Sequence, residues 1–136
     1  MAITKEMLEK LRNYNFSFGE YEKYTDGPGN VYYYEGMAHT IGGAWDGSPL
    51  SKADRKIIEE GIWLPSTEDL MIWLQKEKVS ITISYDAKQG CFCGECVTET
   101  NEHFDDVGSN MQTCLYNLVF KVARYYYYYN NAKKFQ

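Results

Sequence analysis

The sequence predicts an α+β fold in which helices pack on an antiparallel sheet, as two layers or as an α-β-α sandwich. Residues 79–85, VSITISY, alternate strictly between apolar and polar side chains, which is typical of a half-buried strand. From Met111 onwards, apolar residues recur at i, i+4, i+7 and i+11, which is the spacing of a helix with one buried face. The remaining segments predict helices and short strands in mixed order without a repeat, so an α+β class is favoured.

The chain is long enough for one domain with its own core, at 136 residues. We expect residues 1–129 to form a single α+β domain. Residues 130–136 are mostly polar and lie at the end of the sequence, so we expect them to form a flexible tail.

The first quarter of the chain predicts one helix and aromatic strands. Thr4 can cap a short helix that reaches Asn13. Residues 31–34, VYYY, have the composition of a strand, and the turn residues TDGPGN precede them. This strand could close a hairpin with the aromatic segment 16–24. Residues 36–49 are rich in glycine and are predicted to form a loop.

Two capped helices are predicted next. Ser51 and Asp54 predict the start of a helix that ends at Gly61, and its inward-facing residues are expected to be Ala53, Ile57 and Ile58. Residues 63–65 form an extended link. Ser66 then caps a second helix whose first turn is acidic, and its buried face is expected to comprise Leu70, Met71, Trp73 and Leu74.

The cysteines of the segment CFCGEC, residues 91–96, fall in the return strand of a hairpin. If residues 86–90 form the whole turn, Cys91 pairs with Tyr85 and Cys93 with Ile83, so both cysteines lie on the apolar face. Reduced cysteine behaves there as a small apolar residue. A bulge at residues 94–95 would decide the face of Cys96.

The alternative for these cysteines is structural zinc, because C-x-x-C can hold two thiolates on one ion. The four ligands would be Cys91, Cys93, Cys96 and Cys114. A zinc site normally has a second such pair, and the sequence has none. We therefore predict no metal and no cofactor.

Charge indicates a protein partner. The net charge of −5 argues against direct binding to nucleic acid and to anionic membranes. Residues 89–120 contain no Lys or Arg, and five acidic residues fall within them: Glu95, Glu99, Glu102, Asp105 and Asp106. We expect one edge of the hairpin to be negative and to bind a basic surface of another protein, with help from exposed Tyr32 and Tyr34.

No nucleophile–base pair or other catalytic motif is evident, so we predict no catalytic residues and no enzyme activity. The alternative function is a small-molecule binder or sponge, for example for a nucleotide. Backbone amides of the glycine loop could wrap a phosphate there, with Gly42, Gly43, Trp45 and Asp46 as ligand-binding residues. The loop lacks the Gly-Lys-Ser/Thr ending of a P-loop.

Localisation and assembly follow from simpler features. The first six residues turn polar at once, so no secretion signal is predicted, and no apolar run has the length of a membrane span. We expect a cytoplasmic protein with reduced cysteines. A homodimer through the tyrosine-rich strands or the terminal helix is possible.

Residues 63–126 resemble a known pattern. WLPSTEDLMIWL leads into VSITISY, a turn, a second strand and the helix MQTCLYNLVFKVA. This order is similar to small phage and prophage accessory proteins with an α-β-β-α (ABA-sandwich) domain, and more distantly to the β-β-α core of HicB-type antitoxins. The resemblance implies a phage-type accessory protein in the host cytoplasm that inhibits a host protein. A defence nuclease, in an anti-CRISPR or other anti-defence role, would be such a target. No active site is carried over, and fold alone does not fix function.

Overall fold

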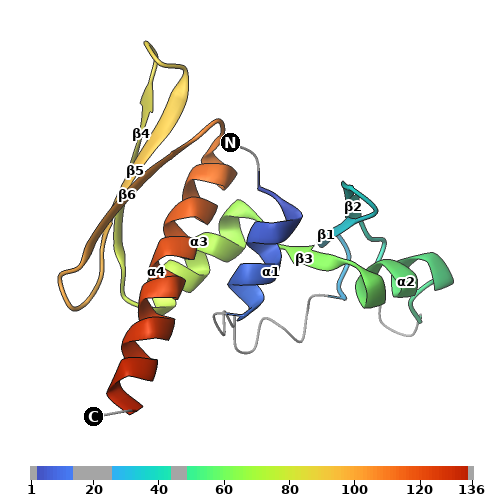
Figure 1. Cartoon of the computed structure of the whole chain (residues 1–136). Helices are drawn as coiled ribbons and strands as arrows, with labels where there is room; N and C mark the ends of the chain where they lie inside the picture. The colour runs from blue at the N-terminus through green and yellow to red at the C-terminus, as the bar shows by residue number, and fades with distance from the viewer. Residues whose placement is uncertain (1–2, 14–25, 44–48, 135–136) are drawn as a thin grey trace.

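The computed structural model describes residues 3–13, 26–43 and 49–134, and within them it has four helices and two three-stranded antiparallel sheets (Figure 1). The helices are α1 (Lys5–Asn13), α2 (Lys52–Glu60), α3 (Thr67–Lys76) and α4 (Met111–Lys134). The strands are β1 (Val31–Tyr34), β2 (Met37–Thr40), β3 (Ile62–Leu64), β4 (Ser80–Asp86), β5 (Cys91–Val97) and β6 (His103–Gly108). The predicted α+β class is confirmed.

The smaller sheet has the strand order β2-β1-β3. Glu35 and Gly36 connect β1 to β2 and have φ angles of 50° and 84°, the left-handed conformation that a tight two-residue hairpin turn requires. Strand β2 was not predicted, because the glycine that makes this turn was assigned to a loop. The extended link at residues 63–65 is largely β3, which pairs with β1. The hairpin predicted with residues 16–24 lies outside the described residues.

The helix starts follow local side-chain chemistry, as predicted. The Thr4 hydroxyl accepts a hydrogen bond from the Met7 amide at 3.2 Å, and the Ser51 hydroxyl accepts one from the Asp54 amide at 3.1 Å. Ser66 and Asp69 form a complete capping box, in which each side chain accepts from the other residue's amide. Because each cap depends on residues three positions apart, the sequence alone identifies it.

The buried faces of α2 and α3 differ from the prediction in part. Helix α2 has no buried residue, and Ala53 is exposed while Ile57 and Ile58 are half-buried. The predicted inward face is thus confirmed for Ile57 and Ile58 in part and was wrong for Ala53; among the described elements, α2 packs mainly on β1. In α3 the predicted face is mostly right, because Leu70, Trp73 and Leu74 are buried and Met71 is half-buried.

The larger sheet has the order β4-β5-β6, and its register corrects the predicted hairpin. Cys91 pairs with Asp86 and Cys93 with Ser84, one residue away from the predicted partners. The turn contains four residues, not five, because Asp86 stays in the strand and its Oδ1 accepts hydrogen bonds from the Lys88 and Gln89 amides. A shift of one residue exchanges the two faces of a strand.

The cysteine assignments are therefore reversed. Cys96 lies on the core face and is 1% exposed, whereas Cys91 and Cys93 lie on the opposite face and are half-buried. The pairing of β5 with β4 runs without interruption, so the bulge considered at residues 94–95 is absent from this ladder. Cys114 is also fully buried.

A third strand, β6, completes this sheet and was not predicted. Its sequence, HFDDVG, is rich in acidic residues and has little strand propensity. It pairs with β5 in the register Cys96–Phe104 and Phe92–Gly108. The segment between α3 and α4 thus has three strands, where the resemblance to ABA-sandwich domains implied two.

Helix α4 covers one face of the larger sheet, which we call the inner face (Figure 1). Two glycines let the helix come close. A Cβ at Gly94 would lie 2.6 Å from Leu118 Cδ1 and 2.9 Å from Cys114 Sγ. A Cβ at Gly108 would overlap the backbone of Cys114, at 2.8 Å from its Cα. Residues as large as alanine are therefore excluded at Gly108 without movement of the helix.

The core joins both sheets to α1, α3 and α4. Its buried cluster includes Leu8 of α1, Ile62 of β3, Leu70 of α3 and Leu118 of α4. Helix α4 has no internal Gly or Pro and continues to Lys134, past Tyr129, where the domain was expected to end. Residues 130–134, which were expected to belong to a flexible tail, are helical.

We expect Gly108→Ala to lower the free energy of unfolding by about 3 kcal/mol, because the new methyl group meets the backbone of α4. Gly94→Ala should cost less, about 1–2 kcal/mol, since Leu118 Cδ1 is the end of a side chain that can rotate. Gly90→Ala is the control: its Cβ would meet nothing, and only its left-handed φ costs about 1 kcal/mol. Urea unfolding gives all three values. Equal losses for Gly108→Ala and Gly90→Ala would contradict the close approach of α4.

Tyr116→Phe should raise the free energy of unfolding by about 1 kcal/mol. Tyr116 is fully buried, and among the described residues its hydroxyl has no hydrogen-bond partner, so the wild type carries an unmet desolvation cost. Tyr34→Phe is the matched control and should not stabilise, because the Tyr34 hydroxyl donates to Glu60 Oε2 at 3.0 Å. A loss of stability in Tyr116→Phe, measured by the same urea titration, would show that the hydroxyl has a partner.

Candidate functional site

The face of the larger sheet that points away from α4, here called the outer face, holds two of the predicted partner-binding residues, Glu95 and Asp105. Alternation along the three strands places these side chains on it: Ser80, Thr82, Ser84, Cys91, Cys93, Glu95, Val97, His103, Asp105 and Val107. They are exposed or half-buried. Among the described residues, no helix packs on this face. It is therefore the larger sheet's accessible surface.

Two carboxylates stand directly opposite each other at the middle of the outer face. Glu95 of β5 pairs with Asp105 of β6, and Thr82 of β4 is the next residue in the same row. Both acidic side chains are exposed. Like charges in direct opposition destabilise a sheet. Among the described residues neither carboxylate forms an ion pair.

Glu99 and Glu102 extend this acidic surface at the loop between β5 and β6. Both are exposed. Glu99 Oε1 lies 3.7 Å from Lys78 Nζ, but both side chains are largely in solvent, so the pair contributes little to stability. The Glu102 amide donates to the Thr98 hydroxyl at 3.0 Å, which orders the loop. Together, Glu95, Glu99, Glu102 and Asp105 form what we call the acidic surface.

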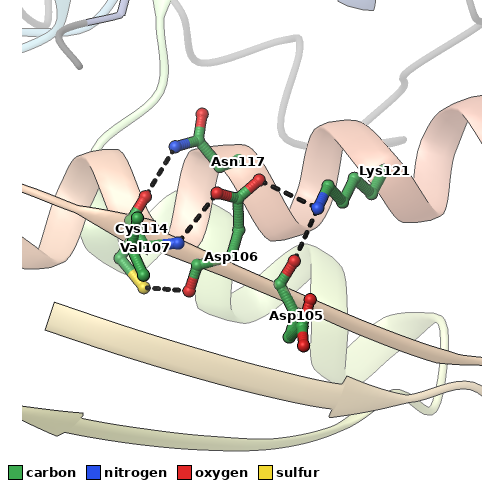
Figure 2. Close-up of polar contacts among 6 residues, drawn as sticks. All are labelled: Asp105, Asp106, Val107, Cys114, Asn117 and Lys121. Atoms are coloured by element: carbon green, nitrogen blue, oxygen red, sulfur yellow. Dashed lines mark hydrogen bonds and ion pairs between the residues drawn. The ribbon is translucent and has the colours of Figure 1, made fainter.

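Asp106 has a different position from its neighbour Asp105, because adjacent residues of a strand point to opposite faces. Figure 2 shows Asp106 turned toward α4, where its Oδ2 lies 3.1 Å from Lys121 Nζ. Lys121 also donates to the Asp105 carbonyl at 2.6 Å, and Asn117 Nδ2 donates to the Val107 carbonyl at 2.9 Å. Asp106 therefore holds β6 to α4 and is not part of the acidic surface.

Lys121 is a residue whose role the sequence did not reveal. It follows Cys114 and Asn117 at helical spacing, so all three reach β6 from one face of α4 (Figure 2). The same cation helps to line an open hollow of about 660 Å³ beside the sheet, together with Arg124, Glu95 and Asp105. Its position neutralises Asp106 and leaves Asp105 without a cation of its own.

The four cysteines do not converge. Cys96 and Cys114 lie between the sheet and α4, and burial raises the pKa of both thiols. Cys91 and Cys93 lie on the outer face, where burial and then a hydrogen bond with Cys91 raise the pKa of Cys93. Across residues 3–13, 26–43 and 49–134, no group of three His, Cys, Asp or Glu side chains is placed to hold a metal ion. This arrangement does not support the zinc alternative.

The two tyrosines expected at the partner surface belong to the other sheet. Tyr32 is 4% exposed, so the prediction that it is available for contact was wrong. Tyr34 is half-buried, donates to Glu60 of α2 and packs edge-on against His39. Burial and the hydrogen bond to Glu60 raise the pKa of Tyr34 to about 12. Neither tyrosine lies in the sheet that carries the acidic surface.

The glycine loop offers little to an anion. The Gly43 amide donates to Asp54 Oδ2 at 3.2 Å, so the chain's own carboxylate occupies the place that a phosphate oxygen would take. A Cβ at Gly42 would also lie 3.4 Å from the same oxygen. The negative charge of Asp54 would repel a phosphate here. Trp45 and Asp46 lie outside the described residues.

Comparisons with protein families, with curated proteins and with solved structures found no match to this chain. The fold and the acidic surface thus have to be interpreted from the chain itself. None of the described helices has the length and apolar content that crossing a membrane requires.

Thiol reactivity tests the register of β5. In the native protein we expect iodoacetamide to modify Cys91 and Cys93 readily, whereas Cys96 and Cys114 react only after unfolding. The raised pKa of Cys93 should move the onset of its reaction to higher pH than in the unfolded chain. Peptide mass spectrometry after timed alkylation identifies each site. The double variant Cys91→Ser with Cys93→Ser should retain no fast thiol; a fast-reacting Cys96 would contradict the register.

Proposed function

We propose that this chain is a non-enzymatic binding protein that docks its acidic surface on a basic surface of another protein and inhibits it. The exposed opposition of Glu95 and Asp105 supports this proposal most directly. The pair destabilises the free sheet, and a single substitution of either residue would remove the repulsion. A cation from a partner that lies between the two carboxylates would remove this repulsion, so binding would stabilise the sheet.

The partner's basic side chain would be arginine or lysine. A guanidinium can donate hydrogen bonds to two carboxylates at once, and charge-assisted bonds of this kind are stronger than neutral ones. Thr82 lies next to Glu95 in the same row and offers a hydroxyl at the rim of the contact. Complementary charge also speeds the encounter of the two proteins.

The partner class proposed is a protein that handles nucleic acid. Its basic groove normally binds phosphates, and carboxylates on a sheet face can compete for the same Lys and Arg side chains. The resemblance to phage accessory proteins supports a host defence nuclease as the target. The chain's net charge of −5 opposes its own binding to nucleic acid.

Charge reversal tests the acidic surface. Host lysate is first passed over the immobilised chain to recover the partner, and the dissociation constant is then measured with both proteins purified. We expect Glu95→Lys with Asp105→Lys to weaken binding by at least tenfold, which corresponds to about 1.4 kcal/mol. The wild-type affinity should also fall as salt increases.

Control variants separate the acidic surface from net charge. Glu9→Lys with Glu59→Lys makes the same change in net charge at exposed positions of α1 and α2, and it should leave the affinity close to wild type. If both double variants lose the same affinity, the acidic surface is not the docking site. Binding that is insensitive to salt and to both variants would remove the electrostatic proposal altogether.

The single variant Glu95→Lys separates binding from folding. It places a lysine opposite Asp105 and beside Thr82, so an attractive pair replaces a repulsive one. We expect the free energy of unfolding to rise by about 0.5–1 kcal/mol while partner binding weakens. A loss of both stability and binding would indicate that Glu95 has a structural role.

A further inference from the structure

Strand β4 is an open edge of the larger sheet. The strand order β4-β5-β6 places it at one side, and among the described residues it pairs with β5 alone. It has seven residues, contains no Lys or Pro, and its pairing with β5 has no bulge. A short length, Lys or Pro residues and bulges are the usual features that keep an edge strand from pairing with another strand. Their absence leaves a row of backbone donors and acceptors available.

The sequence of β4 is symmetric about Thr82. Residues 80–84 read SITIS in both directions, and the symmetry continues in character to Val79 and Tyr85, which are both apolar. The next residues outward are Lys78 and Asp86, which carry opposite charges. An antiparallel neighbour of the same sequence would therefore meet like with like in the strand and opposite charges at its ends.

We propose that a second copy of this chain pairs with β4, antiparallel and with a two-fold axis at Thr82, to form a continuous six-stranded sheet. Ser80 would then lie opposite the second copy's Ser84, and Ile81 opposite its Ile83. Hydroxyl pairs fall on the outer face and β-branched pairs on the inner face, and cross-strand pairs of these kinds stabilise sheets.

Two further observations favour a second copy over an unrelated strand. Tyr85 is an apolar residue of the inner face that is 59% exposed, and in the pair it lies opposite the second copy's Val79. Lys78, which is exposed, would lie near the second copy's Asp86, and the same contact repeats on the other side of the axis. A foreign strand would have to supply the matching charges at both ends.

The proposed dimer does not use the acidic surface. The outer face of β4 carries Ser80, Thr82, Ser84 and, at its end, Asp86, and Glu95 lies one strand away. The proposal is thus independent of the proposed function, and either can fail without the other.

Exchange of charges tests the register. In the variant Ser80→Lys with Ser84→Lys, each lysine would face a lysine of the second copy, and in Ser80→Asp with Ser84→Asp each aspartate would face an aspartate. We expect each variant alone to dimerise at least tenfold more weakly than wild type in sedimentation equilibrium. An equimolar mixture should form heterodimers, because every lysine then faces an aspartate. Circular dichroism of each variant confirms that the monomer is folded.

Crosslinking tests the axis. With Cys91 and Cys93 replaced by serine, Thr82→Cys should form a disulfide-linked dimer under mild oxidation, because directly opposed residues of antiparallel strands have Cα atoms about 4.5–5.5 Å apart. Ser80→Cys is the control and should not crosslink, since its partner is Ser84. A wild-type chain that stays monomeric up to about 100-fold above its working concentration would overturn the proposal. So would a dimer that crosslinks equally at residues 80 and 82, or a mixture of charge variants that stays monomeric.

Discussion

The structure depends on the close approach of α4 to the larger sheet. Cys114 lies at the centre of this contact, because its Sγ sits beneath Gly94 and its backbone lies against Gly108. Asn117 and Lys121 then bind β6 one and two turns away along the same helix face. Interiors are packed closely enough that even one methyl group at such a contact is felt. The inner face of the sheet therefore packs on α4, and in the described part of the chain its outer face and its β4 edge are open to other molecules.

This packing explains why two consecutive aspartates have different roles. Asp106 faces inward and is neutralised by Lys121, so its charge contributes to holding β6 on the helix. Asp105 faces outward beside Glu95, where the same lysine reaches only its backbone carbonyl. Removing one negative charge from the outer face would reduce the repulsion between Glu95 and Asp105. The nearby cation, Lys121, instead pairs with Asp106 on the inner face. The acidic surface thus arises from the way the charges are divided between the two faces of the sheet. The net charge of the chain gives no information on this division.

The sequence predicted features that depend on residues close together in the chain, and it missed features that depend on which strands pair. Helix starts at Ser51 and Ser66 were found because a cap involves residues three apart. The faces of Cys91 and Cys96 were exchanged because one residue in the turn decides the register, and Asp86 completes its strand through hydrogen bonds that composition does not show. Strand β6 has a loop-like composition, and only its pairing with β5 makes it a strand. The acidic run is evident in the sequence, but its division between two faces, with Asp105 outward and Asp106 inward, required that strand to be known.

The edge and the acidic surface would act together if both proposals hold. Adjacent strands of a sheet are about 4.8 Å apart, so in a six-stranded sheet paired at β4 the two copies of Glu95 would be roughly 14 Å apart and the two copies of Asp105 roughly 24 Å apart. Both carboxylate pairs would lie on one continuous face, separated by a strip of serine and threonine. Such a spacing suits a basic groove, in which cations recur along its length, better than a single basic pocket. The second docking contact would then be intramolecular, and the dimer would hold such a groove more tightly than either copy alone.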